Sequence, residues 1–461
     1  MASTYIHRTP SSGGSGTTFT ISFWMKRGRL SFGNQTPFIS HKGGSDYTWL
    51  RFNSSDQMEF LGYKGGPETF DLKTTRLFRD TTAWMHICIT FDSTESVEAD
   101  RLKFYVNGVK ETDFATSNYP TEDNTMIIND TTAANAVGVG NSGATYLSAN
   151  NYWDGCLSHF HFIDGTAYQA STFGETDATS GIWKIKTSPT VTYGTNGFFL
   201  KMEDRTNLDL DSGTNAFTMT TSGTGTATYD NPSNNFCTMN PLDNYFQGAT
   251  FSKGNLYTVM STSNYAWTSG TMPLFAGLWY FETYVDVSVH TDDYLLIGAA
   301  PYTANAANAE LGTNSAFLQD LGYYGYGGGY RRGGSVTSYG DSYGDGNYIG
   351  TYIDLNAEKI YWSKDGVIQN SGTGVALTAI ADTPFGYWLP AMSQYGSGAT
   401  YSINFGNGYF GTTLIGSPSA DEGGIGAFKY DPSAGGASSF DGAAKNFRAI
   451  CTKNIKLYGA P

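Results

Sequence analysis

Two short patterns contain residue types that can do chemistry. Residues 340–344 read Gly-Asp-Ser-Tyr-Gly, the G-x-S-x-G spacing of a serine nucleophile elbow. An elbow requires a strand before the serine and a helix after it, whereas Ser342 lies among tyrosines and glycines. His159 and His161 are two residues apart, so one face of a strand can present both to a metal ion. No partner histidine or third ligand stands out, and we predict structural roles for both patterns.

A tyrosine- and glycine-rich stretch, residues 322–348, is a candidate binding surface. Tyrosines on a glycine backbone offer rigid, amphipathic contacts on an adaptable loop. Nothing in the stretch is apolar enough to build a core, so we predict a surface loop, either with or without a partner. Exposed tryptophans can also stack on sugars, and Trp49, Trp183 and Trp267 are further candidates, with core packing as the alternative. The predicted protein- or glycan-binding residues are Tyr323, Tyr324, Tyr326, Tyr330, Tyr339, Tyr343 and Trp153.

The composition favours more than one all-β domain. The 461 residues exceed what a single core usually holds, and they include 57 glycines and 15% aromatic residues. Such a mixture suits many short strands joined by turns. The net charge is −14, and no basic stripe exists beyond Arg331-Arg332. Because a nucleic-acid backbone requires clustered Lys and Arg, the charge pattern argues against nucleic-acid binding.

The sequence predicts neither membrane insertion nor a disulfide framework. Residues 1–16 lack the apolar core of a signal peptide, and no stretch approaches the length that spans a bilayer. The four cysteines, at positions 88, 156, 237 and 451, form no C-x-x-C pair, so we expect small buried hydrophobes. We expect the chain to be made in a cytoplasm and to stay there, or to leave by lysis or inside an assembled particle.

The first half of the chain shows a run of strand patterns. Apolar side chains alternate through residues 19–25, and further strands are predicted at 84–92, 102–106 and 156–160. The order of Phe-Trp, Trp-x-His, Tyr-Val-Asn-Gly and Trp-Asp-Gly motifs resembles laminin-G-like, concanavalin-type jelly rolls over residues 16 to about 170. That resemblance implies a lectin-like sandwich that binds glycans or protein surfaces and sometimes calcium.

The same resemblance raises two questions of chemistry. Asp154 lies at a turn position where related sandwiches carry a loop carboxylate, and calcium there is the one candidate cofactor; solvated turn carboxylates are the alternative. Related glycoside hydrolases need Glu-x-Asp-x-Glu on one strand, with one acid as nucleophile and another as acid/base. The nearest segment, residues 175–179, reads Glu-Thr-Asp-Ala-Thr and lacks the last acid. We therefore predict that the chain is not an enzyme.

Residues 344–367 predict two adjacent hairpins. One strand covers residues 348–355, a turn follows at Asn356-Ala357, and an aromatic strand ends at Asp365-Gly366. These features resemble the centre of SPRY (B30.2-type) domains, and the segments at 277–282, 296–298, 389–391 and 403–406 follow the same family order. The resemblance implies a bent antiparallel sandwich that binds partners through its loops and catalyses nothing.

We therefore predict an all-β chain of two tandem antiparallel sandwiches. The expected segments are a lead-in at 1–16, a laminin-G-like sandwich at 17–219, a linker at 220–235, a SPRY-like sandwich at 236–410 and a C-terminal extension at 411–461. The predicted linker consists mostly of small and polar residues. The extension ends in two runs, 446–451 and 455–458, that we predict to form strands.

The arrangement as a whole resembles structural proteins of marine tailed bacteriophages, including cyanophages. The resemblance rests on the opening at 5–10, on 160–168 and 194–198, and on the junction at 231–236. It implies a virion surface protein, for which we predict a capsid decoration or knob-like role with capsid or tail proteins as partners. The alternatives are a tail fibre or fibre-tip adhesin for host surface glycans and, more weakly, a polysaccharide depolymerase. Self-association is left open.

Overall fold

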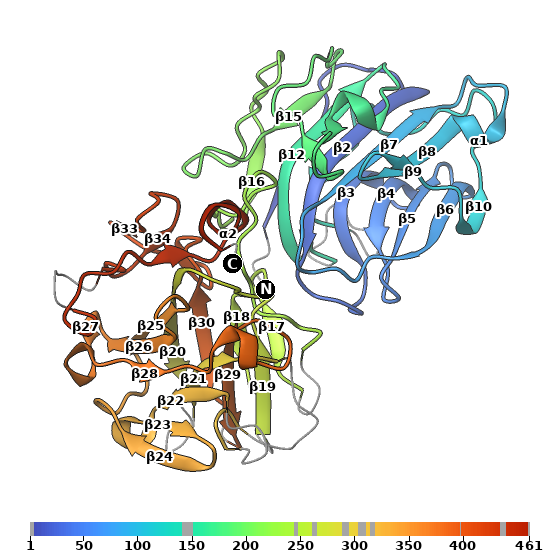
Figure 1. Ribbon diagram of the computed structural model, residues 1–461. Helices are drawn as coiled ribbons and strands as arrows, with labels where there is room; N and C mark the ends of the chain where they lie inside the picture. The colour runs from blue at the N-terminus through green and yellow to red at the C-terminus, as the bar shows by residue number, and fades with distance from the viewer. Residues whose placement is uncertain are drawn as a thin grey trace. The chain divides into compact units, whose positions relative to one another are not determined.

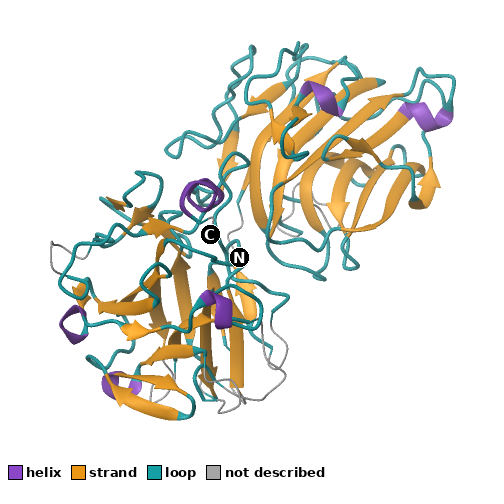
Figure 2. Cartoon of the chain, in the orientation of Figure 1, coloured by secondary structure: helices purple, strands orange, loops and turns teal. Residues whose placement is uncertain are grey.

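The computed structural model describes residues 4–140, 151–243, 248–260, 265–287, 295–302, 310–313, 319–396, 398–433 and 439–459. The chain divides into two compact units, Met1–Ala227 (unit 1) and Thr228–Pro461 (unit 2). Both are built from antiparallel sheets, which confirms the predicted all-β class (Figures 1 and 2). In the described residues the α-helices are α1 (Glu98–Arg101) and α2 (Thr452–Tyr458). The 3-10 turns are η1 (Ala170–Thr172), η2 (Tyr326–Gly328), η3 (Asn370–Gly372) and η4 (Ile380–Asp382).

The described part of unit 1 is a sandwich of an eight-stranded and a six-stranded sheet. The larger has the order β10-β6-β5-β4-β3-β11-β1-β16 and the smaller the order β15-β12-β2-β7-β8-β9. The strands of the larger sheet are β1 (Tyr5–Arg8), β3 (Gln35–Gly43), β4 (Asp46–Phe52), β5 (Gln57–Tyr63), β6 (Glu68–Leu77), β10 (Phe114–Asn118), β11 (Ala134–Val137) and β16 (Thr220–Ser222). Those of the smaller are β2 (Thr18–Arg27), β7 (Met85–Asp92), β8 (Leu102–Val106), β9 (Val109–Lys110), β12 (Gly155–Asp164) and β15 (Phe198–Leu200), beside a hairpin of β13 (Gly174–Thr176) and β14 (Trp183–Ile185).

The core of unit 1 follows from the alternation along its strands. Phe19 and Phe23 of β2 point inward and meet Phe38 and Phe60 from the facing sheet, all fully buried. Two segments differ from the prediction. Part of the expected lead-in forms β1, which pairs with β11, and part of the expected linker forms β16, which pairs with β1. β1 and β16 have 4 and 3 residues, too few to show the apolar alternation on which the sequence prediction relied.

The described part of unit 2 also holds two main sheets. One runs β17-β18-β30-β20-β25-β26-β27, with β28 on β26 and β35 on β20, and the other β19-β29-β21-β22-β23-β24. The first comprises β17 (Thr250–Ser252), β18 (Tyr257–Val259), β20 (Leu278–Val287), β25 (Tyr348–Asp354), β26 (Lys359–Lys364), β27 (Val367–Ile368), β28 (Val375–Ala376), β30 (Thr400–Asn404) and β35 (Arg448–Ala449). The second comprises β19 (Tyr265–Ser269), β21 (Leu296–Ala300), β22 (Leu321–Tyr324), β23 (Gly329–Arg332), β24 (Ser335–Ser338) and β29 (Leu389–Tyr395). Small hairpins are β31 (Tyr409–Phe410) with β32 (Thr413–Leu414) and β33 (Ser419–Ala420) with β34 (Ala427–Phe428).

The predicted pair of hairpins lies at the centre of unit 2. β25, β26 and β27 are consecutive antiparallel neighbours, as the sequence predicts. Fully buried Trp279 of β20 and Trp362 of β26 belong to the core between the two sheets. Their immediate neighbours in the same strands, Tyr280 and Tyr361, face the opposite way.

The C-terminal extension covers that opposite face. Its residues Phe428, Phe440 and Phe447 are buried in one cluster with Tyr280, Tyr352 and Tyr361, rings carried by β20, β25 and β26. The predicted strand at 446–451 is present as the short β35, parallel to β20. The second predicted strand, 455–458, is wrong because these residues belong to α2. The alternation Ile455-Lys456-Leu457 fits either period over so few residues.

Candidate functional site

The tyrosine-rich stretch contributes mainly to the core of unit 2, which corrects the prediction of a surface loop. Tyr323, Tyr339 and Tyr343 are at most 4% exposed and belong to the cluster around Trp362. The Tyr343 hydroxyl donates to the carbonyl oxygens of Leu295 and Tyr323, both at 2.8 Å. A tyrosine body can therefore fill a core when its hydroxyl finds an acceptor, a role that composition does not reveal.

Of the six predicted tyrosines, four have almost no surface to offer a partner. Tyr324 is 5% exposed, and the Arg331 guanidinium lies 4.4 Å from its ring centroid. Direct contact through Tyr323, Tyr324, Tyr339 or Tyr343 is thus incompatible with this conformation. Tyr326 is 54% exposed on η2 and Tyr330 is half-buried, so partner binding by these two stays a prediction.

The surroundings of Asp154 do not fit a calcium site. One carboxylate oxygen, Oδ2, is buried without a hydrogen-bond partner, but the nearest charged groups include Arg29 and Arg27. Burial raises the pKa of Asp154, and the two guanidinium groups oppose that shift. In the part of the chain that the structure describes, no three His, Cys, Asp or Glu side chains gather as metal ligands do. Calcium at Asp154 stays a prediction that these residues do not support.

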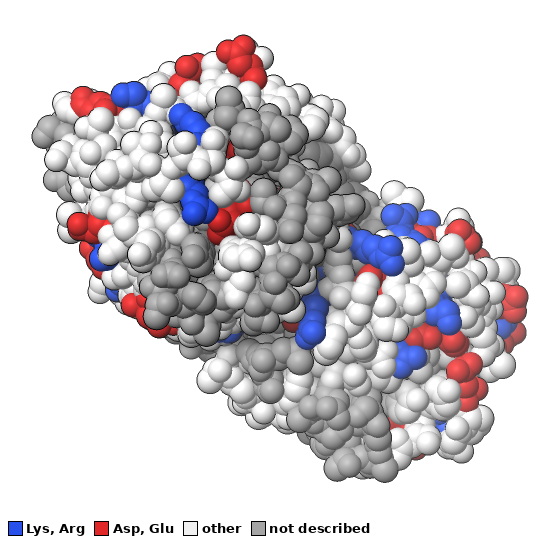
Figure 3. All heavy atoms as spheres, turned by 90° about the horizontal axis from the view of Figure 1, so that it is seen from below, with Lys and Arg blue, Asp and Glu red and all other residues white. Residues whose placement is uncertain are grey.

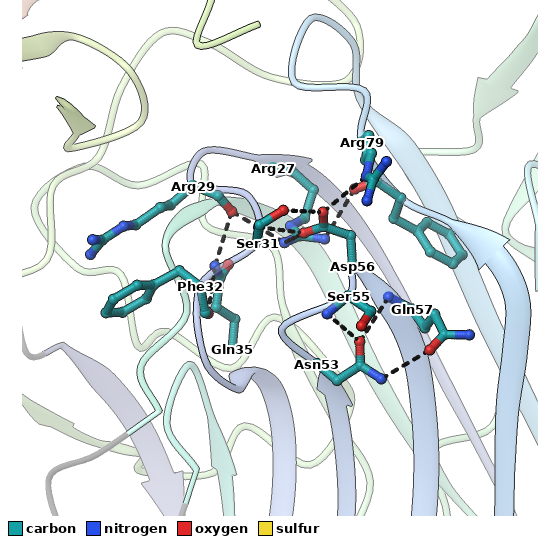
Figure 4. A network of polar contacts seen from close by, with 11 residues as sticks. Arg27, Arg29, Ser31, Phe32, Gln35, Asn53, Ser55, Asp56, Gln57 and Arg79 are labelled. Carbon is teal, nitrogen blue, oxygen red and sulfur yellow. Dashed lines mark hydrogen bonds and ion pairs between the residues drawn. The ribbon is translucent and has the colours of Figure 1, made fainter. Parts of the chain in front are cut away.

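Figure 4 shows a polar network around buried Asp56 and Arg27. Arg27 is also one of the charged groups that act on Asp154. Asp56 accepts hydrogen bonds from Arg27 Nη2 and Arg79 Nε, both at 3.2 Å, and from the backbone N–H and hydroxyl of Ser31. Arg27 also donates to the carbonyl oxygens of Phe78 and Arg29. These contacts join the segments around residues 27–31, 56 and 78–79. Because Arg27 and Asp56 are almost fully buried, we assign the network a structural role: it holds these segments together at one end of the sandwich.

Trp153 lies at the same end and is half-buried. Its ring centroid is 5.7 Å from that of Phe52, and it packs against the core of unit 1. Three other tryptophans considered for stacking on sugars also pack within their units. Trp49 and Trp267 are 6% and 7% exposed, and the Trp183 indole N–H donates to His86 Nδ1 at 3.1 Å. Glycan binding by Trp153 stays a prediction, and its free surface is small.

The predicted structural roles of the histidines agree with their surroundings. His161 stacks on Phe199 with centroids 3.9 Å apart, and its Nδ1 lies 2.9 Å from the Tyr193 hydroxyl. His159 tilts against the same phenylalanine at 5.7 Å. His86 has Ser22 Oγ at 2.8 Å from Nε2, but its Nδ1 already accepts the Trp183 N–H. The neutral imidazole therefore donates from Nε2 and cannot act as a base toward Ser22.

The acids considered for glycoside hydrolysis are not arranged as a catalytic pair. Glu175 is an exposed residue of β13, and Asp177 follows in the turn toward β14. Asp177 pairs with Lys184 at 2.6 Å and accepts backbone N–H groups of Thr179 and Ser180. These contacts, Lys184 first, hold the pKa of Asp177 below its usual range. A permanently ionised, turn-bound aspartate cannot serve as a general acid near neutral pH.

A site that the sequence did not predict lies on the outward side of the eight-stranded sheet. Strand register aligns its side chains in three rows that run across β3 to β6 and β10. We call this surface the Tyr47 face. Its first row is His41, Tyr47, Tyr63 and Glu68; its second is Ile39, Trp49, Leu61, Asp71 and Asn118; its third is Arg51, Glu59 and Lys73.

The three rows differ in chemistry. The Tyr47 and Tyr63 rings stack with centroids 5.0 Å apart, and both side chains are half-buried. Trp49 and Leu61 in the middle row are nearly covered. In the third row, Arg51 Nε donates to Glu59 at 2.5 Å, and its guanidinium lies 4.5 Å from the Trp49 ring centroid. The face thus combines flat apolar surface with charged and polar groups.

The acidic groups of the Tyr47 face are unequal. The pKa of Asp71 is raised to about 6, first by burial and then by the negative charges of Glu59 and Glu68. The positive charges of Lys73 and Arg51 oppose this shift. Glu59 faces both cations, with Lys73 at 4.0 Å. On the view in Figure 3, the coloured Lys, Arg, Asp and Glu side chains are interspersed with uncharged residues and form no broad basic field.

The segment Asp-Tyr-Thr-Trp-Leu-Arg-Phe of β4 contains the signal that sequence reading missed. Tyr47, Trp49 and Arg51 alternate with the inward Thr48, Leu50 and Phe52. A period of two with aromatic and charged residues on one side indicates a strand whose outward side can offer these groups to a ligand. Its partners on β5 and β6 become recognisable only once the strand register is known.

Comparisons with known proteins agree with the two folds. Residues 2–172 match the profile described as Concanavalin A-like lectin/glucanases superfamily. No curated protein matches the chain. In the described residues, no helix is long and apolar enough to cross a membrane.

Solved structures with similar folds include two of different kinds. The SPRY domain of human HERC1 is 16% identical over 36% of this chain and 96% of its own, with a TM-score of 0.28. A heptameric SAP-like pentraxin from Limulus polyphemus is 11% identical over 42% of this chain and 88% of its own, with a TM-score of 0.29. No ligand, partner or activity follows from likenesses this low. The concanavalin A-like match lies within unit 1, and the described parts of both units are built mainly from antiparallel β-sheets.

Proposed function

We propose that this chain is a non-enzymatic binding protein on the surface of a tailed-phage virion, most simply a capsid decoration or knob-like protein. The observation that carries the binding role is the Tyr47 face. Stacked, half-buried Tyr47 and Tyr63 beside Arg51, Glu59 and Lys73 offer apolar rings and hydrogen-bonding groups together. Sites that bind glycans or protein surfaces need this combination.

The virion assignment is supported by the resemblance of the whole chain to phage structural proteins. Three of the resembling segments lie in unit 1, and the fourth, 231–236, lies at the start of unit 2. The partners proposed are capsid or tail proteins and a host surface glycan. Neither a nucleic acid nor a lipid bilayer is among them. Self-association is a further proposal, testable by the mass of the purified protein in solution.

Counting copies of the chain per purified virion, by quantitative mass spectrometry against the major capsid protein, tests the proposal. Hundreds of copies support decoration of the capsid. About a dozen or two support the alternative, a tail fibre or fibre-tip adhesin. Absence of the chain from virions contradicts the proposal.

A polysaccharide depolymerase is the weaker alternative. Turnover of host lipopolysaccharide or capsule by the purified protein, lost in Glu175→Gln, would favour it over a binding role. The lysine-paired Asp177 and exposed Glu175 lead us to expect no turnover. The variant Asp113→Asn, at an exposed residue of the same unit, is the matched control.

A further inference from the structure

One buried carboxylate oxygen of the Tyr47 face, Asp71 Oδ1, has no hydrogen-bond partner. Glu59 is engaged by Arg51 and Lys73, and Glu68 accepts hydrogen bonds from the Tyr63 hydroxyl and Asn118 Nδ2, both at 3.2 Å. Asp71 Oδ1, by contrast, is buried and has no hydrogen-bond partner. A buried acceptor without a donor costs free energy. A ligand that brings a donor to this oxygen recovers that cost.

Nearly covered apolar side chains adjoin the unpartnered oxygen, and the apolar surface beside them belongs to two half-buried tyrosine rings. Asp71 lies opposite Leu61, which lies opposite Trp49 in the middle row. The stacked rings of Tyr47 and Tyr63 form the next row. A sugar ring has an apolar C–H face for such rings and hydroxyl groups at its rim. The spacing of neighbouring strands, about 4.8 Å, places both kinds of contact within reach of one or two sugar units.

The charges of the face select among sugars. Three carboxylates, on Glu59, Glu68 and Asp71, stand against two cations, Arg51 and Lys73. Both cations are already directed at Glu59. An acidic sugar would meet net negative charge and find no uncommitted cation among these residues, and like charges at close range repel. A neutral sugar meets no such penalty and donates its hydroxyl protons to a carboxylate.

We propose that the Tyr47 face binds a neutral, polyhydroxylated glycan, with Asp71 accepting its hydroxyl groups and the Tyr47–Tyr63 pair stacking on its rings. This inference rests on the proposed function and specifies its ligand. Asp71 determines specificity, because its unpartnered oxygen calls for a donor. Acidic polysaccharides are excluded by the surplus carboxylate.

Affinity should depend on pH through Asp71. The charged groups that face it are Glu59 on β5, Arg51 on β4, and Glu68 and Lys73 on its own strand. Hydroxyl groups bond more strongly to an ionised carboxylate than to a neutral one. The affinity for a neutral glycan should therefore rise between pH 5 and pH 7.5, as Asp71 loses its proton.

Calorimetric titration of the full chain tests the inference, with cellohexaose, maltohexaose and mannohexaose as neutral probes and hexagalacturonic acid as the acidic probe. We expect at least one neutral probe to bind and the acidic probe not to bind. Asp71→Asn should weaken binding at pH 7.5 at least fivefold and remove the rise with pH, and Tyr47→Ala should weaken it similarly. Asp113→Asn, exposed at another position of unit 1, should match the unaltered chain.

The outcomes separate this inference from the proposed function. Binding of the acidic probe alone, no binding of any probe, or an unchanged affinity in both Asp71→Asn and Tyr47→Ala would overturn the neutral-glycan site. Each of these results leaves the copy number per virion, and with it the virion assignment, intact. Conversely, absence from virions would contradict that assignment even if the glycan bound. Unchanged thermal unfolding of each variant shows that lost binding is not lost folding.

Discussion

Buried histidines of unit 1 and buried carboxyl groups of unit 2 respond to pH in opposite ways. In unit 1, burial lowers the pKa of His86 to about 3 and that of His161 well below 6.5. In unit 2, burial raises the pKa of Glu282 to about 7, although Lys429, Tyr430, Asn404 and Tyr280 donate hydrogen bonds to it. Two units of one fold class can therefore answer a change of pH in opposite directions.

The direction follows from which state binds the proton more tightly. A histidine with a lowered pKa is neutral in the folded unit, so its contribution is complete above pH 6.5 and is lost as the pH falls. A carboxyl with a raised pKa favours folding when protonated, so its contribution is complete below pH 4.5 and is lost as the pH rises through about 7. Burial also raises the pKa of Glu310 to about 7, although Arg331 opposes the shift. Protonated Glu310 therefore adds to the stability of unit 2 at low pH. In unit 1 the pKa of Asp71 is raised to about 6, so protonation of Asp71 partly offsets the stability that the histidines lose at low pH.

The largest effect we expect comes from a buried ion pair of unit 1, whose arginine stays charged over the whole pH range compared. Asp56→Asn removes the carboxylate that pairs with buried Arg27 and leaves this cation without its ion-pair partner inside unit 1. The free energy of unfolding of unit 1 should fall by about 3–5 kcal/mol. Urea denaturation of the full chain, followed by proteolysis assigned to each unit by mass spectrometry, measures it. Asp113→Asn is the control; a loss as small as in that variant would show that Arg27 reaches water.

The opposite pH responses give the next largest effect. His86 alone should lower the free energy of unfolding of unit 1 by about 2–3 kcal/mol between pH 6.5 and pH 4.5. Unit 2 should gain stability over the same interval. Thermal unfolding at several pH values, with each transition assigned to a unit by proteolysis, checks both signs. Parallel shifts of the two transitions would contradict the comparison.

Glu282→Gln sharpens the comparison within unit 2. The carboxylate accepts backbone N–H groups of Lys429 at 2.9 Å and Tyr430 at 2.8 Å, which fastens the C-terminal extension to β20. At pH 5 Glu282 is protonated and turns one O–H bond toward these donors, whereas a glutamine turns an NH2 group, with two N–H bonds, toward one set of them. We expect a loss of about 1–3 kcal/mol in unit 2 at pH 5 and faster proteolysis within residues 411–459. The gain of stability on acidification should shrink as well; an unchanged pH response would assign it to other carboxyl groups.

Local patterns predicted what depends on local rules. The hairpins β25–β26–β27 follow from alternating residues and the Asp365-Gly366 turn, in which Asp365 has a φ of +50° and Gly366 a φ of +82°. The inward residues of β2 follow from a period of two. Both signals are complete within about ten residues, so no long-range pairing is needed to recognise them.

The positions of the buried tyrosines and of the Tyr47 face depend on pairing between distant segments, which the sequence alone does not show. Tyr323 and Tyr339 lie 16 positions apart, yet both rings meet Trp362, at 5.6 Å and 5.2 Å between centroids. Glycine-rich spacing made them resemble a flexible surface loop, whereas the β22–β23–β24 pairing places them in the core. The Tyr47 face is similar: Tyr47, Tyr63 and Asp71 come together through register, which the sequence does not state.

The smallest effect concerns one hydrogen bond that keeps His86 neutral. Trp183→Phe keeps an aromatic ring beside the histidine but removes the N–H that donates to its Nδ1 at 3.1 Å. Unit 1 should lose about 0.5–1.5 kcal/mol at pH 7.5, where the imidazole is neutral in both states. Trp24→Phe is the matched control, because Trp24 also contacts His86 while its buried Nε1 has no hydrogen-bond partner. At pH 5 the Trp183→Phe deficit should narrow, since an Nδ1 without a donor accepts a proton more readily. A deficit that stays constant would mean that ring packing, not the donated hydrogen bond, holds His86 in its neutral form.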